Sequence, residues 1–138
     1  MSVENNKKLV RRFYELLQQQ NYDAVAELCH QDFVFYPQID TPLSGVKGFI
    51  EAEKKNFDAS PDFKMPLKAI MAEGDEVAIY LEFEGTHTDD LFGVPATGKT
   101  IRMSLMMLLR IADGKIIEKR AHYDKYDILR QIGVNLTY

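Results

Sequence analysis

The sequence has little cysteine: Cys29 is the only one among its 138 residues. A lone cysteine cannot form an internal disulfide, which favours a reducing compartment, so we predict a cytoplasmic location. Long hydrophobic runs are also lacking, because no uncharged stretch reaches the roughly 18 to 20 residues that a membrane-spanning helix needs. Residues 1–20 are charged and polar from the start, unlike a secretory signal. We therefore expect a soluble protein without a membrane partner.

The chain has no excess of positive charge. Lysine and arginine total 17 and aspartate and glutamate total 21, so the formal net charge is −4. Nucleic-acid-binding domains usually carry a basic face, so this balance argues against a nucleic-acid partner. Hydrophobic residues make up 46% of the chain, which is enough for a core. The length suits one domain, which we predict to span residues 1–138.

The first part of the chain has the pattern of helices. Apolar residues recur at helical spacing between Leu9 and Leu17. A short second helix is predicted to carry Ala24, Val25 and Leu28 on one side and to end near His30. The β-branched and aromatic residues 33–36 favour a strand. Ser44 stands where it could cap a third helix over residues 46–57.

The second part changes to the two-residue alternation of β-strands. Strands are predicted over residues 63–72, 77–83, 101–111 and 115–123. Asp113-Gly114 is a strong signal for a hairpin turn, and a short final helix is predicted over residues 125–131, with Gly133 at its end. Helices followed by hairpins predict an α+β fold, in which a curved antiparallel sheet carries its helices on one face.

Residues 93–100 (GVPATGKT) match the phosphate-binding pattern G-x-x-x-x-G-K-[ST]. That pattern binds phosphate between a strand and a helix, where backbone N–H groups and the helix N-terminus converge on the anion. Here a strand-like segment follows instead, and Pro95 removes one N–H donor. We therefore interpret this segment as a connection within a hairpin.

The three histidines are His30, His87 and His122. No pair has the spacing of metal ligands, and Cys29 has no partner motif, so we predict no metal site. His87 and His122 lie near the ends of predicted strands, where the mouth of a cavity would be. A structural role is an equal alternative for each.

The strand predicted over residues 115–123 has two different faces. One face carries Glu118, Arg120, His122 and Asp124, and the other carries Ile117, Lys119, Ala121 and Tyr123. Alternating charge usually marks an outer face in contact with solvent. If the charged face instead points into an apolar cavity, loss of water raises the pKa of a carboxyl group there toward values useful for general acid–base catalysis. Periodicity alone leaves open which face points inward.

Four segments and one acidic residue carry a family resemblance. The segments are residues 85–87 (GTH), 93–99 (GVPATGK), 110–118 (RIADGKIIE) and 129–133 (LRQIG). With Asp124, they resemble the SnoaL-like polyketide cyclases, which belong to the nuclear transport factor 2-like superfamily together with ketosteroid isomerase. The resemblance spans essentially the whole chain in order. It implies a cone-shaped sheet wrapped around three N-terminal helices, with an apolar internal pocket and a short C-terminal helix.

These cyclases close a polyketide ring by an intramolecular aldol reaction without a cofactor. The resemblance therefore implies cofactor-free acid–base catalysis, of the aldol cyclase or isomerase type, on a hydrophobic carbonyl compound. It places the acid–base aspartate of the family at Asp124, its arginine at Arg120, and its Gly-x-His histidine at His87. Members are commonly dimeric, so a homodimer is implied as well.

From these observations we predict Asp124 as the general base, with His122 or His87 donating to the developing oxyanion or orienting the base. Substrate contacts are predicted from Tyr14, Tyr36, Met103, Leu105, Met107 and Arg120. Leu105 and Met107 stand where the cyclase pocket carries a glutamine and a histidine, so a non-catalytic domain that binds the small molecule is the alternative. Asp124 also directly precedes the predicted last helix, so capping the N-terminus of that helix is an alternative role for its side chain.

The strand over residues 101–111 is apolar on one face and still partly apolar on the other. The second face consists of Arg102, Ser104, Met106, Leu108 and Arg110. Two large apolar side chains on an outer face favour burial from solvent. We therefore predict a symmetric dimer that forms through the outer face of the sheet and buries them.

Overall fold

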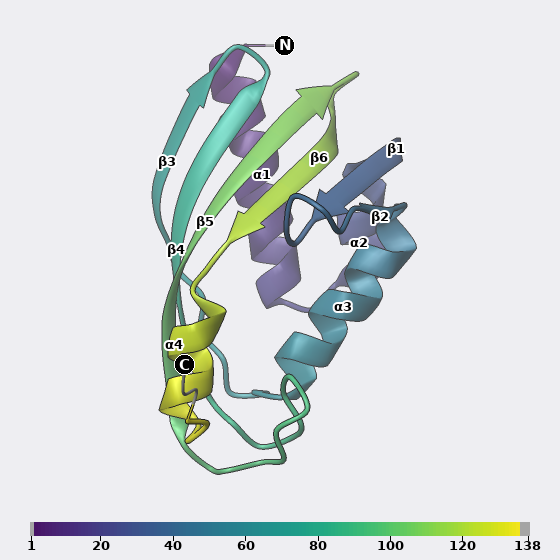
Figure 1. The fold of residues 1–138 in the computed structure, drawn as a ribbon. Helices are drawn as coiled ribbons and strands as arrows, with labels where there is room; N and C mark the ends of the chain where they lie inside the picture. Colours follow the sequence, from purple (N-terminus) through teal and green to yellow (C-terminus); the bar gives the residue numbers. More distant parts are fainter. Residues whose placement is uncertain (1, 136–138) are drawn as a thin grey trace.

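The structure is a computed structural model that describes residues 2–135 (Figure 1). The helices are α1 (Val3–Gln18), α2 (Tyr22–Glu27), α3 (Val46–Asp58) and α4 (Lys125–Gln131). The strands are β1 (Cys29–Tyr36), β2 (Leu43–Ser44), β3 (Leu67–Glu73), β4 (Glu76–Thr86), β5 (Thr100–Ala112) and β6 (Lys115–His122). The predicted α+β class, the curved sheet and the short C-terminal helix are confirmed.

One six-stranded sheet organises the fold, in the order β2-β1-β6-β5-β4-β3. Every pairing is antiparallel except that of β1 with β6. The sheet curves strongly along β4 and β5, and α1 to α3 lie together on one side of it (Figure 1). The core lies between these helices and the sheet, where the rings of Phe13, Phe33, Phe35 and Phe49 pack together.

The turn at Asp113-Gly114 joins β5 to β6 as predicted. Both residues have positive φ, 54° and 73°, which is the requirement of a two-residue hairpin turn that matches the twist of the strands. Residues 100–112 form a strand and not a helix. The segment over residues 93–100 therefore lacks the following helix that a phosphate-binding loop needs.

The start of α3 differs from the prediction. Ser44 lies in β2 and does not cap the helix; Gly45, with φ of 88°, occupies the N-cap and offers no side-chain hydrogen bond. The conformation there favours glycine, because side chains rarely adopt positive φ. The expectation of a serine cap was therefore wrong.

Two strand boundaries also differ. β1 begins at Cys29, earlier than predicted, because this part of the chain pairs in parallel with β6, as in the register Cys29 to Ile116. His30 therefore lies in a strand, and the prediction that it ends the second helix was wrong. β3 begins at Leu67, later than predicted, and only an isolated bridge from Lys64 to Glu84 precedes it. Pairing with another strand determines both boundaries, and the residue preferences within each segment do not predict such pairing.

A β-bulge in β6 decides which of its side chains face the helices. Arg110 pairs with Glu118 and Ile111 pairs with Ile116, so Ile117 is an extra residue on β6. A bulge of this kind reverses the alternation of the strand beyond it. Ile116 is buried before the bulge, and Lys119 and Ala121 are buried after it, whereas His122 is exposed.

Within residues 2–135, no helix is long and apolar enough to cross a membrane.

Candidate functional site

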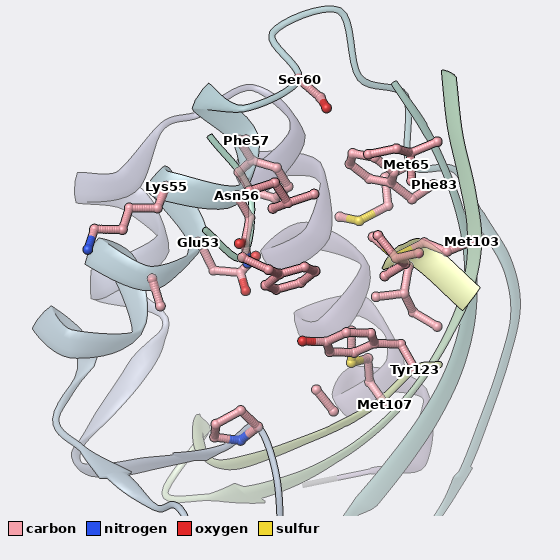
Figure 2. A pocket seen from close by; sticks show the side chains of 18 of the residues that line it. Glu53, Lys55, Asn56, Phe57, Ser60, Met65, Phe83, Met103, Met107 and Tyr123 are labelled. Atoms are coloured by element: carbon pink, nitrogen blue, oxygen red, sulfur yellow. The ribbon is translucent and has the colours of Figure 1, made fainter. Parts of the chain in front are cut away.

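A cavity of about 380 Å³ lies between α3 and the concave part of the sheet (Figure 2). Its volume falls within the range of small-molecule sites, which is about 300 to 1,000 Å³. Most of its wall is apolar and comes from Phe35, Phe57, Met65, Phe83, Leu91, Phe92, Ile101, Met103, Leu105, Met107, Ala121 and Ile128. Such a lining suits a hydrophobic ligand.

Few polar groups reach this cavity. They belong to Tyr14, Glu53, Asn56, Ser60, Lys119 and Tyr123, with Lys55 and Asp90 as exposed lining residues. Figure 2 shows the Glu53 side chain extending from α3 into the cavity and the Tyr123 hydroxyl extending into it from the sheet side. A ligand between them would meet one carboxylate, one amine and two phenols within an apolar wall.

Glu53 reaches the cavity because of its position on α3. Phe49, Glu53 and Phe57 are four residues apart, so they share one face of the helix, and both phenylalanines are buried. Burial raises the pKa of the Glu53 carboxyl from its ordinary value of 4.5, and the nearby charge of Lys119 partly opposes this rise. A carboxyl with a raised pKa in a cavity is suited to general acid–base chemistry.

Lys119 is the most unusual group at the site. Its side chain is only 1% exposed, and its Nζ lies 4.7 Å from the ring centre of Phe35 and 5.1 Å from that of Phe49. The polar contact of this amine is a weak one, to Sδ of Met107 at 3.7 Å. Among the described residues, Lys119 forms no ion pair with a carboxylate. Burial lowers the pKa of its ammonium group from 10.5, although Glu53 opposes the shift.

Tyr14 lines the cavity from α1 with a buried hydroxyl. That hydroxyl has no hydrogen-bond partner among the described residues. Burial, followed by the charge of Glu53, raises the pKa of Tyr14 well above 10.0, so the phenol keeps its proton and can donate it in a hydrogen bond. A ligand oxygen would satisfy this group, since buried polar groups normally have partners.

Four of the residues predicted to contact substrate line the cavity. They are Tyr14, Met103, Leu105 and Met107. Tyr36 and Arg120 do not: they are paired across β1 and β6, and the Arg120 guanidinium lies 4.0 Å from the centre of the Tyr36 ring. Arg120 also donates to Oε1 of Glu118 at 2.7 Å, on the face of β6 opposite the cavity.

The three residues predicted to be catalytic lie outside the cavity lining. Asp124 is exposed and caps α4, accepting a hydrogen bond from the Asp127 N–H at 3.0 Å, and His122 is exposed. His87 is fully buried, and its Nδ1 lies 2.9 Å from Oγ1 of Thr97, where it holds the loop that precedes β5. Asp124 does not line the cavity beside Leu105 and Met107; of the two faces of β6 that the sequence left open, the one with Lys119 and Ala121 points inward. Catalytic roles for these three residues stay predictions, and none of the three lines the cavity.

Sequence reasoning missed Glu53 and Lys119. Glu53 had a signal, since it repeats the helical spacing of Phe49 and Phe57. Lys119 had no such signal, because the side of the sheet to which its side chain points depends on the bulge at Ile117. Among residues 2–135, no cluster of three His, Cys, Asp or Glu side chains could hold a metal ion.

Comparison with known proteins agrees with the fold. The sequence model of the SnoaL-like polyketide cyclases matches residues 7–132. The chain is 30% identical over 128 residues to aklanonic acid methyl ester cyclase DnrD of Streptomyces peucetius, covering 91% of this chain and 88% of that one. It is 30% identical over 115 residues to nogalonic acid methyl ester cyclase of Streptomyces nogalater, covering 80% and 84% of the two chains. A SnoaL-like protein of Jannaschia sp. has the same fold, with a TM-score of 0.89 at 21% identity over 96% of this chain and 94% of that one.

Proposed function

We propose that this chain, which belongs to the SnoaL-like polyketide cyclase family, catalyses a cofactor-free, cyclase-type reaction on a hydrophobic carbonyl compound, with Glu53 as the general base. The observation that carries the proposal is the Glu53 carboxyl inside an apolar cavity, where burial raises its pKa. The curated relatives described above are named as cyclases of polyketide methyl esters, which supports the same reaction class.

The proposed reaction is an intramolecular aldol addition. Glu53 removes a proton from the carbon next to a carbonyl, and the electron pair moves onto the carbonyl oxygen. The Tyr14 hydroxyl donates a hydrogen bond to this oxygen as its negative charge develops. The enolate carbon then attacks a second carbonyl of the same molecule, a carbon–carbon bond forms, and the new alkoxide takes the proton back from Glu53. The substrate and the product therefore have the same mass.

This proposal replaces the base predicted from the resemblance. A base must come within hydrogen-bond reach of the proton that it removes. Glu53 lines the cavity, whereas Asp124 is exposed and caps α4.

The test compares Glu53→Gln with Glu51→Gln, an exposed position on the same helix. The trial substrates are aklanonic acid methyl ester and nogalonic acid methyl ester, and the readout is chromatographic conversion to an isomer of equal mass. Loss of a general base typically costs about 100-fold to 10,000-fold in rate, so Glu53→Gln should lose turnover by at least the lower figure. Glu51→Gln should keep it. Full turnover by folded Glu53→Gln would refute the assignment.

The second candidate function is binding of the same class of ligand without turnover. It is favoured by Leu105 and Met107, whose apolar side chains line the cavity on β5 where polar donors could have stood. Tight binding of both esters with no isomer formed after long incubation, in wild-type protein, would support this alternative over the enzyme.

A further inference from the structure

The acid–base proposal leaves the Lys119 amine without a role. A buried lysine normally has a carboxylate partner, because removing an ammonium group from water is costly. Lys119 is 1% exposed, forms no ion pair among the described residues, and has the Met107 thioether as its polar neighbour. Yet it lines the cavity beside Tyr14 and Ala121.

We propose that Lys119 is a nucleophile that forms a Schiff base with the carbonyl carbon of the ligand in this cavity. The inference rests on the proposed function, because it assumes that the cavity binds a carbonyl compound. It adds a covalent step and names the ligand class as aldehydes and ketones with an accessible carbonyl.

The step balances with the amine, the ligand carbonyl, the Glu53 proton and water. The neutral amine attacks the carbonyl carbon and forms a carbon–nitrogen bond, and a proton moves from the nitrogen to the oxygen to give a carbinolamine. The protonated Glu53 carboxyl then gives its proton to this oxygen, which leaves as water, and a protonated imine remains between Lys119 and the ligand. Glu53 can then remove a proton from the adjacent carbon, because the positive imine accepts the electron pair. After the new carbon–carbon bond forms, water adds to the imine and releases the product and the amine.

The surroundings of Lys119 favour the neutral amine that this step needs. Apolar and aromatic groups replace water around Nζ, and this burial lowers the pKa of the ammonium group. The facing titratable groups are Glu53 of α3, Tyr14 of α1 and Cys29 of β1. A charged Glu53 works against the neutral form, and the ring faces also attract a cation, but desolvation is the larger effect.

The test traps the imine by reduction. Wild-type protein is incubated with β-naphthaldehyde and sodium cyanoborohydride near neutral pH, and the modified lysine is located by peptide mapping in a mass spectrometer. Each unit by which a lysine pKa falls gives about tenfold more neutral amine, so Lys119 should be labelled faster than any exposed lysine. The labelling rate should also rise with pH through a midpoint below 10.5.

Two variants make the test specific. Lys119→Met replaces the amine with an apolar side chain of similar length and should lose the fast label. Lys54→Met should keep it, because Lys54 is exposed on α3 and is not among the residues that line the cavity. If Lys119→Met fails to fold, the peptide map of the wild-type protein still decides the question. Fast label on Lys119 supports the proposal; label spread evenly over exposed lysines contradicts it.

Displacement of the dye anilinonaphthalene sulfonate separates the two proposals. If the aldehyde displaces the dye but labels no lysine preferentially, the Schiff base is refuted and the carbonyl site stands. If the aldehyde neither displaces the dye nor labels Lys119, both proposals are contradicted.

Discussion

At the scale of single residues, the difference between Glu53 and Asp124 is one of surroundings. Both are carboxylates, but Glu53 lines an apolar cavity and Asp124 is exposed at the end of β6. One carboxylate oxygen of Asp124 accepts a hydrogen bond from the N–H of Asp127, as is usual for an N-cap residue. The chemistry available to each follows from what surrounds it, and sequence position alone does not reveal this.

Substitution of Asp124 should affect stability and not turnover. Asp124→Ala removes the cap of α4 and should lower the free energy of unfolding by about 1 kcal/mol, measured by chemical denaturation. Asp124→Asn should retain most of the stability, since asparagine caps helices about as well. Loss of turnover in folded Asp124→Asn would instead support the role predicted from the family resemblance.

The raised pKa of Glu53 predicts the pH dependence of both rate and stability. Turnover should rise with pH through a midpoint above 4.5, because only the carboxylate form accepts a proton. Stability should change in the opposite direction. The folded state binds this proton more tightly than the unfolded state, so the contribution of Glu53 is present below the unfolded pKa and is lost as pH rises through the folded pKa. Denaturation of wild type and Glu53→Gln across this window measures the difference; a gap that does not change with pH would contradict it.

At the scale of secondary structure, the bulge at Ile117 builds the site. It places Ile116 and Lys119 on the same side of β6, although they are three residues apart. Deletion of Ile117 would leave Ile116 and Lys119 two residues apart, so simple alternation would keep Lys119 and Ala121 on the inner side of β6 without a bulge.

Deletion of Ile117 should therefore preserve cooperative folding, because Lys119 and Ala121 still face inward while Arg120 and His122 stay on the outer side of β6. Circular dichroism during thermal denaturation measures this, with Ile117→Val as the control that keeps the bulge. A deletion variant that loses cooperative unfolding would contradict this account of the bulge.

The same bulge explains why the sequence predicted the strands better than the site. Alternation between residues 101 and 111 identified β5, and Asp113-Gly114 identified the hairpin, because both signals are local. Which face of β6 points inward depends on pairing with β5, which is not local. Leu105 and Met107 line the cavity as predicted, because the alternation of their strand is a local signal. Asp124, the predicted base, is not among the residues that line it.

At the scale of the whole molecule, the outer face of the sheet is partly apolar. Met71, Met106 and Leu108 are 66%, 51% and 39% exposed. Cross-strand pairing places Met71 beside Ala78, and Ala78 beside Leu108, so these side chains form a continuous row over β3, β4 and β5. An exposed apolar row of this kind favours association through the sheet.

We predict a symmetric dimer that buries this row. Sedimentation velocity of the wild-type protein at micromolar concentration should show the dimer. Leu108→Glu should shift it to monomer, because the interface would then have to remove two carboxylates from water. Ile39→Glu is the control, since Ile39 is 71% exposed but lies in the loop after β1, away from the sheet. A strictly monomeric wild-type protein would contradict the prediction.

Proton exchange at the carbon next to a ketone tests the proposed site without knowledge of the natural substrate. The hydrophobic ketone β-tetralone would be incubated with the protein in deuterated water, and loss of its α-proton signal followed by nuclear magnetic resonance. Our account predicts that wild type accelerates the exchange above the buffer rate, that Glu53→Gln abolishes the acceleration, and that Glu51→Gln and Asp124→Asn retain it. Acceleration that persists in folded Glu53→Gln, or that is lost in folded Asp124→Asn, would contradict the assignment of Glu53 as the base.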